Sequence, residues 1–105
     1  MLFDLFRKQD INKGVEEFRN TEHAVLLDVR TEEEYRGGHI PGSMNIDVAQ
    51  IHTAPSVLKD KTIPLFVYCY SGARSGRAVS LLKNMGYTNV KNIGGISAYS
   101  GGTER

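Results

Sequence analysis

The chain has 105 residues, fewer than the roughly 150 of a typical domain, so we expect a single domain over residues 1–105. Thirteen Lys and Arg against twelve Asp and Glu leave a formal charge of +1, and 40% of the residues are hydrophobic. This composition is typical of globular proteins, and the near-neutral charge argues against nucleic-acid and membrane-surface partners.

Residues 1–8 read MLFDLFRK, where charged residues soon interrupt the apolar ones. A secretory signal needs about 7–15 uninterrupted apolar residues and a membrane span about 20. We therefore expect a cytoplasmic protein, in whose reducing surroundings a lone thiol stays free. Cys69 is the single cysteine, which excludes an intrachain disulfide, a Cys-x-x-Cys redox pair and a cysteine-rich zinc site.

The first part of the chain predicts two helices around a buried strand. A very short strand at residues 10–11 precedes a helix that Asn12 caps. Residues 24–28, AVLLD, form an apolar run of the kind buried on both faces of a parallel sheet. Thr31 and Glu34 then have the spacing of a capping box, and the acidic first turn of this second helix is expected in solvent.

The rest of the chain continues the alternation of strands and helices. Residues 43–46 predict a short strand, and residues 65–69, LFVYC, predict a buried one. The clearest helix covers residues 75–85 and ends before Gly86, and residues 89–93 predict a last strand. Together these elements predict an α/β fold with a mainly parallel sheet of four to five strands and helices on both faces.

A small polar loop follows Cys69 and leads into the clearest helix. Its residues are Tyr70, Ser71, Gly72, Ala73, Arg74 and Ser75. Ligands of parallel sheets bind beyond the carboxyl ends of the strands. Backbone N–H groups of such a loop and the positive end of the next helix both favour a thiolate, and Arg74 adds a positive charge. We therefore expect Cys69 to have a lowered pKa.

These residues also have purely structural interpretations. Cys69 can be a core residue that closes an apolar strand, as many free cysteines are. Arg74 can contact a ligand, or it can lock the loop through a carboxylate such as Asp28. Tyr70 can flank the mouth of the site, where its ring would shield a reactive sulfur or select a donor, or it can simply pack.

Several segments of the chain resemble the rhodanese family of single-domain sulfurtransferases. Residues 28–30, DVR, are similar to the family's aspartate-valine-arginine stretch, and residues 38–43, GHIPGS, to its glycine-histidine-isoleucine-proline-glycine segment. Residues 69–75, CYSGARS, resemble its active-site loop. The glycines at 94–95 stand where the family has a late glycine pair, but Tyr99 takes the place of a frequent tryptophan, which we expect to loosen the last turn.

The resemblance implies a three-layer rhodanese-like fold and sulfur transfer without a cofactor. Cys69 would take a sulfane sulfur from thiosulfate or a persulfide and hold it as a persulfide, until cyanide, a thiol or a protein acceptor removes it. Backbone N–H groups of residues 70–75 would bind the anions, with the hydroxyls of Ser71 and Ser75 as further donors. Because the chain has no second thiol, the sulfur has to leave to an external acceptor.

Three other residues are expected to support the site rather than react. Asp28 and Arg30 suit a buried scaffold pair better than a substrate contact. His39 lies in a turn bounded by Gly and Pro, where a hydrogen bond from its ring to the backbone is a better interpretation than a catalytic pairing with Cys69. The three histidines lack the ligand spacing of a zinc site, and no metal is predicted.

Two alternative functions stay open at this point. A cysteine phosphatase or arsenate reductase of related fold would place its arginine six positions after the cysteine, whereas Arg74 lies five positions after Cys69. A non-catalytic binding module could keep the same fold to hold a partner, although such relatives often lack the cysteine.

Overall fold

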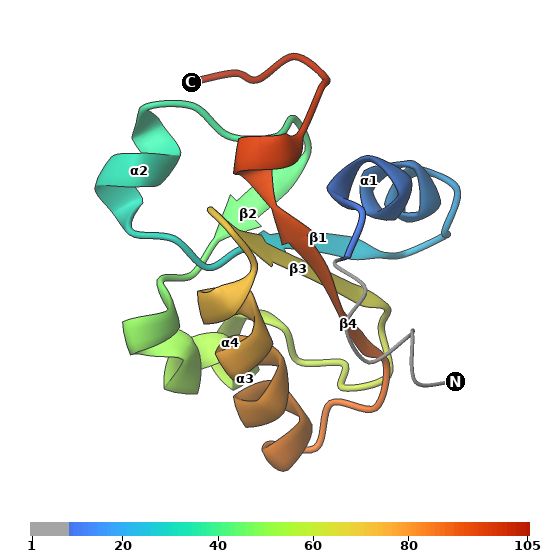
Figure 1. Cartoon of the computed structure of the whole chain (residues 1–105). Coiled ribbons are helices and arrows are strands. Elements are labelled where there is room, and N and C mark those ends of the chain that lie inside the picture. The colour runs from blue at the N-terminus through green and yellow to red at the C-terminus, as the bar shows by residue number, and fades with distance from the viewer. Residues whose placement is uncertain (1–8) are drawn as a thin grey trace, which may run out of the picture.

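The computed structural model describes residues 9–105, which form a sheet of four parallel strands (Figure 1). The strands are β1 (Val25–Asp28), β2 (Ser43–Asn45), β3 (Leu65–Cys69) and β4 (Val90–Gly95). Their order in the sheet is β2-β1-β3-β4, and each neighbouring pair is parallel. Every residue of the inner strand β3 is buried, as its apolar sequence predicts. The α/β class is confirmed.

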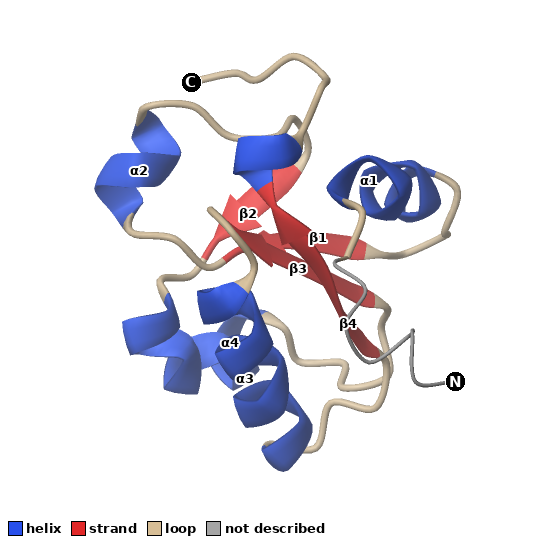
Figure 2. Cartoon of the chain, in the orientation of Figure 1, coloured by secondary structure: helices blue, strands red, loops and turns tan. Residues whose placement is uncertain are grey.

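Helices cover both faces of the sheet, as Figures 1 and 2 show. On one face α1 (Ile11–Arg19) buries Ile11 and Val15 against the sheet. On the other face lie α4 (Ala73–Asn84), α3 (Ala54–Val57) and the 3-10 segment η2 (Val48–Thr53). A short helix, α2 (Glu32–Arg36), follows β1, and a 3-10 turn, η3 (Ile96–Ala98), follows β4. Within residues 9–105 no helix combines the length and apolar character needed to cross a bilayer.

The predicted strand at residues 10–11 and the predicted cap at Asn12 are both wrong. Asp10 is the N-cap of α1, because its carboxylate accepts hydrogen bonds from the N–H groups of Asn12 at 3.1 Å and Lys13 at 3.3 Å. The helix therefore begins at Ile11, and the described sheet has four strands. The expectation about a leader in residues 1–8 lies outside the described residues.

Two other predicted helix ends are confirmed. The hydroxyl of Thr31 accepts from the N–H of Glu34 at 3.1 Å, and the carboxylate of Glu34 accepts from the N–H of Thr31 at 3.0 Å, which completes the capping box. After α4 the chain passes through Gly86 with φ +102°, a conformation that suits glycine at a helix end.

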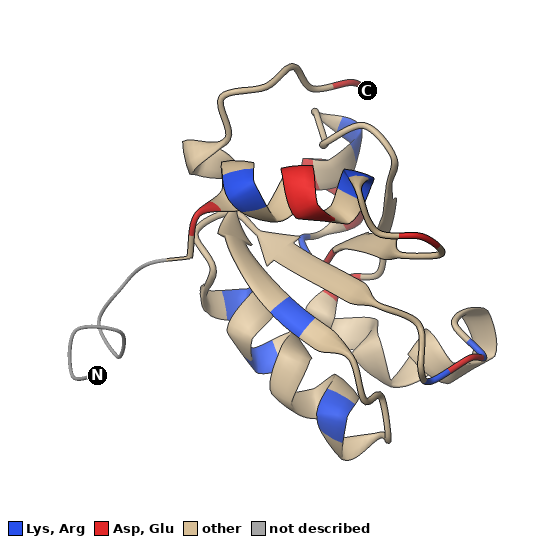
Figure 3. Ribbon diagram, turned by 90° about the vertical axis from the view of Figure 1, so that its right-hand side faces the viewer, with Lys and Arg blue, Asp and Glu red and all other residues tan. Residues whose placement is uncertain are grey.

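Charged residues of both signs are spread over the molecule (Figure 3), but those of α4 are all basic. Its sequence, ARSGRAVSLLKN, contains Arg74, Arg77 and Lys83 and no acidic residue. The helix that begins beside Cys69 therefore carries positive side chains in addition to its positive amino-terminal dipole.

Candidate active site

Cys69 is the last residue of β3, and its side chain lies at the amino end of α4, the positive end of the helix dipole. The residue is 1% exposed. Only Tyr70, Ser71 and Gly72 separate it from α4, which begins at Ala73 rather than at the predicted residue 75. Gly72 has φ +104° and serves as the N-cap, a backbone conformation that residues with a Cβ rarely adopt. This glycine turns the chain so sharply that residues 73–75 form the first turn of the helix.

We call residues 69–75 the sulfur cradle, because donors from this segment surround the Cys69 sulfur. The N–H of Gly72 donates to Sγ at 3.0 Å, and the Ser75 hydroxyl lies 3.4 Å from it. Burial raises the pKa of the thiol, but the Ser75 hydroxyl and the N–H groups of Ser75, Gly72 and Ser71 stabilise the thiolate and outweigh that effect. The pKa of Cys69 is therefore lowered, in the direction expected from the loop sequence.

The late glycine pair allows β4 to press against the cradle. A Cβ at Gly95 would overlap the carbonyl oxygen of Tyr70, and a Cβ at Gly72 would lie 3.6 Å from the Cα of Gly94. The pairing of β3 with β4 shifts between Val67 and Tyr68, so that Gly94 and Gly95 come to lie beside Tyr68 and Cys69. Two backbones approach here at a distance that only glycine permits.

Arg74 braces the cradle through Glu34 of α2. The guanidinium donates to the two carboxylate oxygens at 2.7 and 3.1 Å, in a two-pronged ion pair whose side chains are 38% and 34% exposed. The carboxylate that locks the loop is Glu34 rather than Asp28, the example considered above, and the expectation that Glu34 would be simply solvated is wrong. Hydrogen bonds from Arg74, together with those from Thr31, lower the pKa of Glu34 to about 2 against the opposing effect of burial.

The brace predicts a pH-dependent effect of Glu34→Gln on thermal stability. The carboxylate titrates at about 4.3 in the unfolded chain and at about 2 in the folded one, so its contribution is complete above pH 4.3 and lost as the pH falls toward 2. We expect the variant to melt below the wild type at pH 7, and the difference in Tm to shrink between pH 5 and pH 3. Thermal unfolding followed by circular dichroism measures it.

Glu32→Gln is the matched control, because Glu32 forms an exposed ion pair with Arg36 on the same helix. We expect the control to change Tm little at any pH. A Tm difference for Glu34→Gln that is the same at pH 7 and pH 3 would contradict the brace.

Asp28 and Arg30 form a buried pair at the carboxyl end of β1. They are 0% and 5% exposed, and an Arg30 Nη2 to Asp28 Oδ2 distance of 2.7 Å joins them. The same nitrogen donates to the carbonyl of Gly38 at 2.8 Å, and the Asn45 amide donates to the carbonyl oxygens of Asp28 and Arg30. The pair therefore holds the segment around Gly38 beside the site.

His39 lies in this segment and contacts the backbone. Its Nδ1 donates to the carbonyl of Tyr35 at 2.8 Å, and its ring stacks on the Tyr35 ring with a centroid distance of 3.7 Å. The backbone of His39 also pairs with Glu104 in an antiparallel bridge, and Tyr99 packs on the α1 side of the core, so the last residues are held despite the missing tryptophan. Through these contacts His39 holds the backbone of its own segment in place.

The remaining loop residues lie at the surface. Tyr70 is 55% exposed and, with Thr31, Glu34 and Gly38, lines an open hollow of about 620 Å³ beside the cradle. Ser71 and Ala73 are exposed too, and it is the Ser71 N–H that acts on the sulfur. Among residues 9–105 no three His, Cys, Asp or Glu side chains gather as a metal site.

Comparison with known proteins agrees with this architecture. The family model described as Rhodanese-like domain matches residues 12–101. The chain belongs to the rhodanese-like domain family.

Its relatives include a Bacillus subtilis (strain 168) protein known as uncharacterized protein YqhL, which is 39% identical over 89 residues, covering 82% of this chain and 69% of that protein. Thiosulfate sulfurtransferase PspE of Escherichia coli (strain K12) is 38% identical over 71 residues, covering 67% of this chain and 68% of that protein. The solved structure "rhodanese with anions from E. coli" superposes with a TM-score of 0.72 at 32% identity, over 78% of this chain and 98% of that chain. The expected rhodanese-like fold is confirmed.

Asn92 contacts the cradle of this rhodanese-like domain, although no motif in the sequence includes it. Its Oδ1 accepts from the Ser75 hydroxyl at 2.7 Å and from the Gly94 N–H at 3.0 Å, and its Nδ2 donates to the Gly72 carbonyl at 3.1 Å. The sequence feature that could have identified Asn92 is a polar residue inside the last apolar strand, just before the glycine pair.

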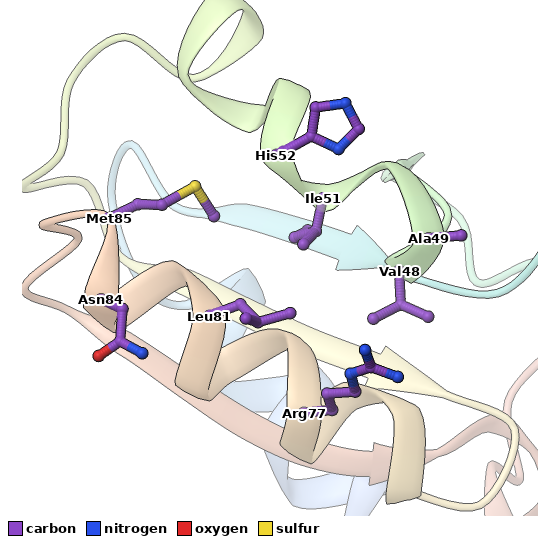
Figure 4. Close-up of a pocket in the computed structure, with 8 residues that line it drawn as sticks. All are labelled: Val48, Ala49, Ile51, His52, Arg77, Leu81, Asn84 and Met85. Carbon is purple, nitrogen blue, oxygen red and sulfur yellow. The ribbon is translucent and has the colours of Figure 1, made fainter.

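A second hollow, of about 640 Å³, lies along the flank of α4 away from the cradle (Figure 4). Its walls are mainly apolar residues of η2 and α4, among them Ile51 and Leu81, with Arg77 at one end. The residues that line it come from positions 48–52 and 77–85, so the donors that surround the sulfur are not part of it. The hollow along α4 and the cradle are therefore separate features of the domain.

Proposed function

We propose that the protein is a rhodanese-type sulfurtransferase that moves a sulfane sulfur from a donor to a nucleophilic acceptor through a persulfide on Cys69, without a cofactor. The observation that carries this proposal is the Cys69 sulfur, which lies at the amino end of α4 with the Gly72 N–H at 3.0 Å and the Ser75 hydroxyl at 3.4 Å. Such donors stabilise a sulfur anion before the reaction begins. The thiosulfate sulfurtransferase named among its relatives supports the same activity.

The reaction divides into two displacements at sulfur. The Cys69 thiolate attacks the sulfane sulfur of thiosulfate, the S–S bond to sulfite breaks, and sulfite leaves with the electron pair. Cyanide or a thiolate then attacks the outer sulfur of the persulfide, and Cys69 leaves as a thiolate. The electrons balance without an external oxidant or reductant, and the scheme predicts ping-pong kinetics.

The charges around the cradle support an anionic donor. The amino end of α4, which carries the positive end of the helix dipole, follows the loop after Cys69 directly, and α4 contains no acidic residue. We infer that thiosulfate or an organic persulfide is the donor, that a thiol or a protein thiol is the acceptor, and that the reaction takes place in the reducing cytoplasm.

Two features make phosphate chemistry the weaker candidate. The loop between Cys69 and α4 is only three residues long, residues 70–72. The Arg74 guanidinium is paired with Glu34 rather than free to grip a tetrahedral oxyanion. Both features suit a site for one sulfur atom.

A donor and acceptor comparison tests the proposal. We expect thiosulfate or glutathione persulfide to support transfer to cyanide or a thiol, with parallel double-reciprocal plots. Mercaptopyruvate is assayed as a third donor, so that the rates with the three donors can be ranked. An aryl phosphate should not be hydrolysed. Aryl phosphate hydrolysis without sulfur transfer would favour the phosphatase, and no turnover with any donor would favour the binding module.

A further inference from the structure

We propose that Asn92 is a positioning residue of the sulfur cradle: its side chain holds Gly72 and Ser75 where their donors meet the Cys69 sulfur. Its part in turnover rests on the proposed sulfur transfer, whereas its effect on the thiol does not. Asn92 lies in β4, and one amide connects three segments, namely the loop, the first turn of α4 and the glycine pair.

The backbone partners of Asn92 fix which way its amide points. The Gly94 N–H needs an acceptor and lies 3.0 Å from Oδ1, while the Gly72 carbonyl needs a donor and lies 3.1 Å from Nδ2. The Ser75 hydroxyl, 2.7 Å from Oδ1, therefore has to donate its proton to Asn92. No exchange of the amide oxygen and nitrogen satisfies all three partners.

The Ser75 hydroxyl has one proton and three acceptors within reach, of which the Gly94 carbonyl, at 3.5 Å, is the most distant. Ser75 is fully buried, and its oxygen lies 2.7 Å from Asn92 Oδ1 and 3.4 Å from Cys69 Sγ. While the sulfur is neutral, as a thiol or as the inner atom of a persulfide, the hydroxyl donates its hydrogen bond to Asn92 Oδ1. When the thiolate forms, its charge draws the hydroxyl across. Asn92 is thus the partner of the buried hydroxyl while the sulfur is neutral, and it keeps Ser75 beside the sulfur for the state in which the thiolate forms.

Gly72 is held in the same way from its other side. Its N–H donates to the Cys69 sulfur at 3.0 Å, and its carbonyl accepts from Asn92 as well as from the N–H of Gly76. Gly72 has φ +104°, a conformation that glycine can leave easily. The two contacts restrict this backbone rotation and so keep the N–H directed at the sulfur.

The alternation of side chains along β4 places Asn92 on the face of the sheet that α4 covers, in register with Val67. Ile93 packs in the core on the α1 side, whereas Asn92 contacts α4 and the cradle. Tyr68 pairs with Gly94, so Ile93 is an extra residue in the strand, and this bulge brings Gly94 and its N–H beside the cradle.

The test measures how the alkylation of Cys69 by iodoacetamide depends on pH, because alkylation reports the thiolate and requires no sulfur transfer. We expect the wild type to titrate below the value of about 8.5 for a free cysteine. Asn92→Ala should raise the apparent pKa by about one unit, which leaves about tenfold less thiolate at a given pH below it. Asn92→Asp should raise it at least as much, because it loses the Gly72 contact and adds a negative charge.

Three further variants separate positioning from stability. Asn89 lies just before β4, and its side chain makes no hydrogen bond with the described residues. In Asn89→Ala the Cys69 thiol should therefore titrate as in the wild type. Ser75→Ala should raise the pKa, and the Asn92→Ala/Ser75→Ala double variant should raise it by less than the sum of the two. Should Asn92→Ala unfold, Asn92→Ser carries the test, because it removes the amide without adding a charge.

Folded Asn92 variants that alkylate with the wild-type pKa would overturn the inference, even if their Tm were lower. The proposed function fails separately: a wild type that transfers no sulfur would refute that proposal while the shifts in alkylation remained.

Discussion

We expect Cys69→Ser to abolish sulfur transfer, with a loss in rate of at least about a thousandfold, because the only nucleophile of the proposed covalent route is removed. A serine hydroxyl stays protonated at neutral pH and forms no persulfide. The oxygen can still accept the Gly72 N–H and fits the space of the sulfur, so the fold should survive. Thiocyanate formation from thiosulfate and cyanide measures the loss.

The control for this variant is its stability. Its unfolding midpoint should stay close to that of the wild type, and Cys69→Ala should show the same loss of activity. If either folded variant formed thiocyanate at a rate comparable to that of the wild type, the sulfur would travel by a route that does not involve Cys69.

The second large effect is expected at the buried ion pair. Arg30→Met should lower the free energy of unfolding by about 3–5 kcal/mol, because it leaves the Asp28 carboxylate charged, buried and unpaired. It also removes the hydrogen bond to the Gly38 carbonyl. Since the free energy of unfolding of a small domain is about 5–15 kcal/mol, this loss is a large share of the stability. Urea denaturation at pH 7 measures it.

Arg36→Met is the matched control, because Arg36 pairs with Glu32 at the surface, where both side chains are exposed. We expect it to cost about 0–1 kcal/mol. The double variant Asp28→Leu/Arg30→Met should recover part of the loss, since it leaves no unpaired charge behind. Equal small losses for Arg30→Met and Arg36→Met would show that the buried pair does not hold this end of the sheet.

The elements with strong local signals could be predicted from the sequence. The bounds of β3 match the apolar run LFVYC, because burial on both faces requires continuous apolar residues. The capping box of Thr31 and Glu34 depends on neighbouring residues alone. The position of Cys69 before a glycine-containing turn likewise indicates a thiol at a helix amino end.

Contacts between distant segments could not be predicted in this way. Glu34 and Arg74 are forty residues apart in the chain, and only the packing of α2 against the start of α4 makes them partners. Asp28 was one candidate partner of Arg74, but it pairs with Arg30, two residues away in the chain. The early start of α4 follows from the positive φ of Gly72, and the role of Asn92 follows from its contacts with Gly72 and Ser75, which lie 17 to 20 residues earlier in the chain.

The most direct test of the central claim is the intact mass of the protein after incubation with thiosulfate and no acceptor. Because Cys69 is the single cysteine of the chain, a gain in mass equal to one sulfur atom assigns the persulfide without further mapping. We predict that the wild type gains this mass, that cyanide removes it with release of one equivalent of thiocyanate, and that Cys69→Ser never gains it. A wild type whose mass stays unchanged with both thiosulfate and glutathione persulfide would contradict the account.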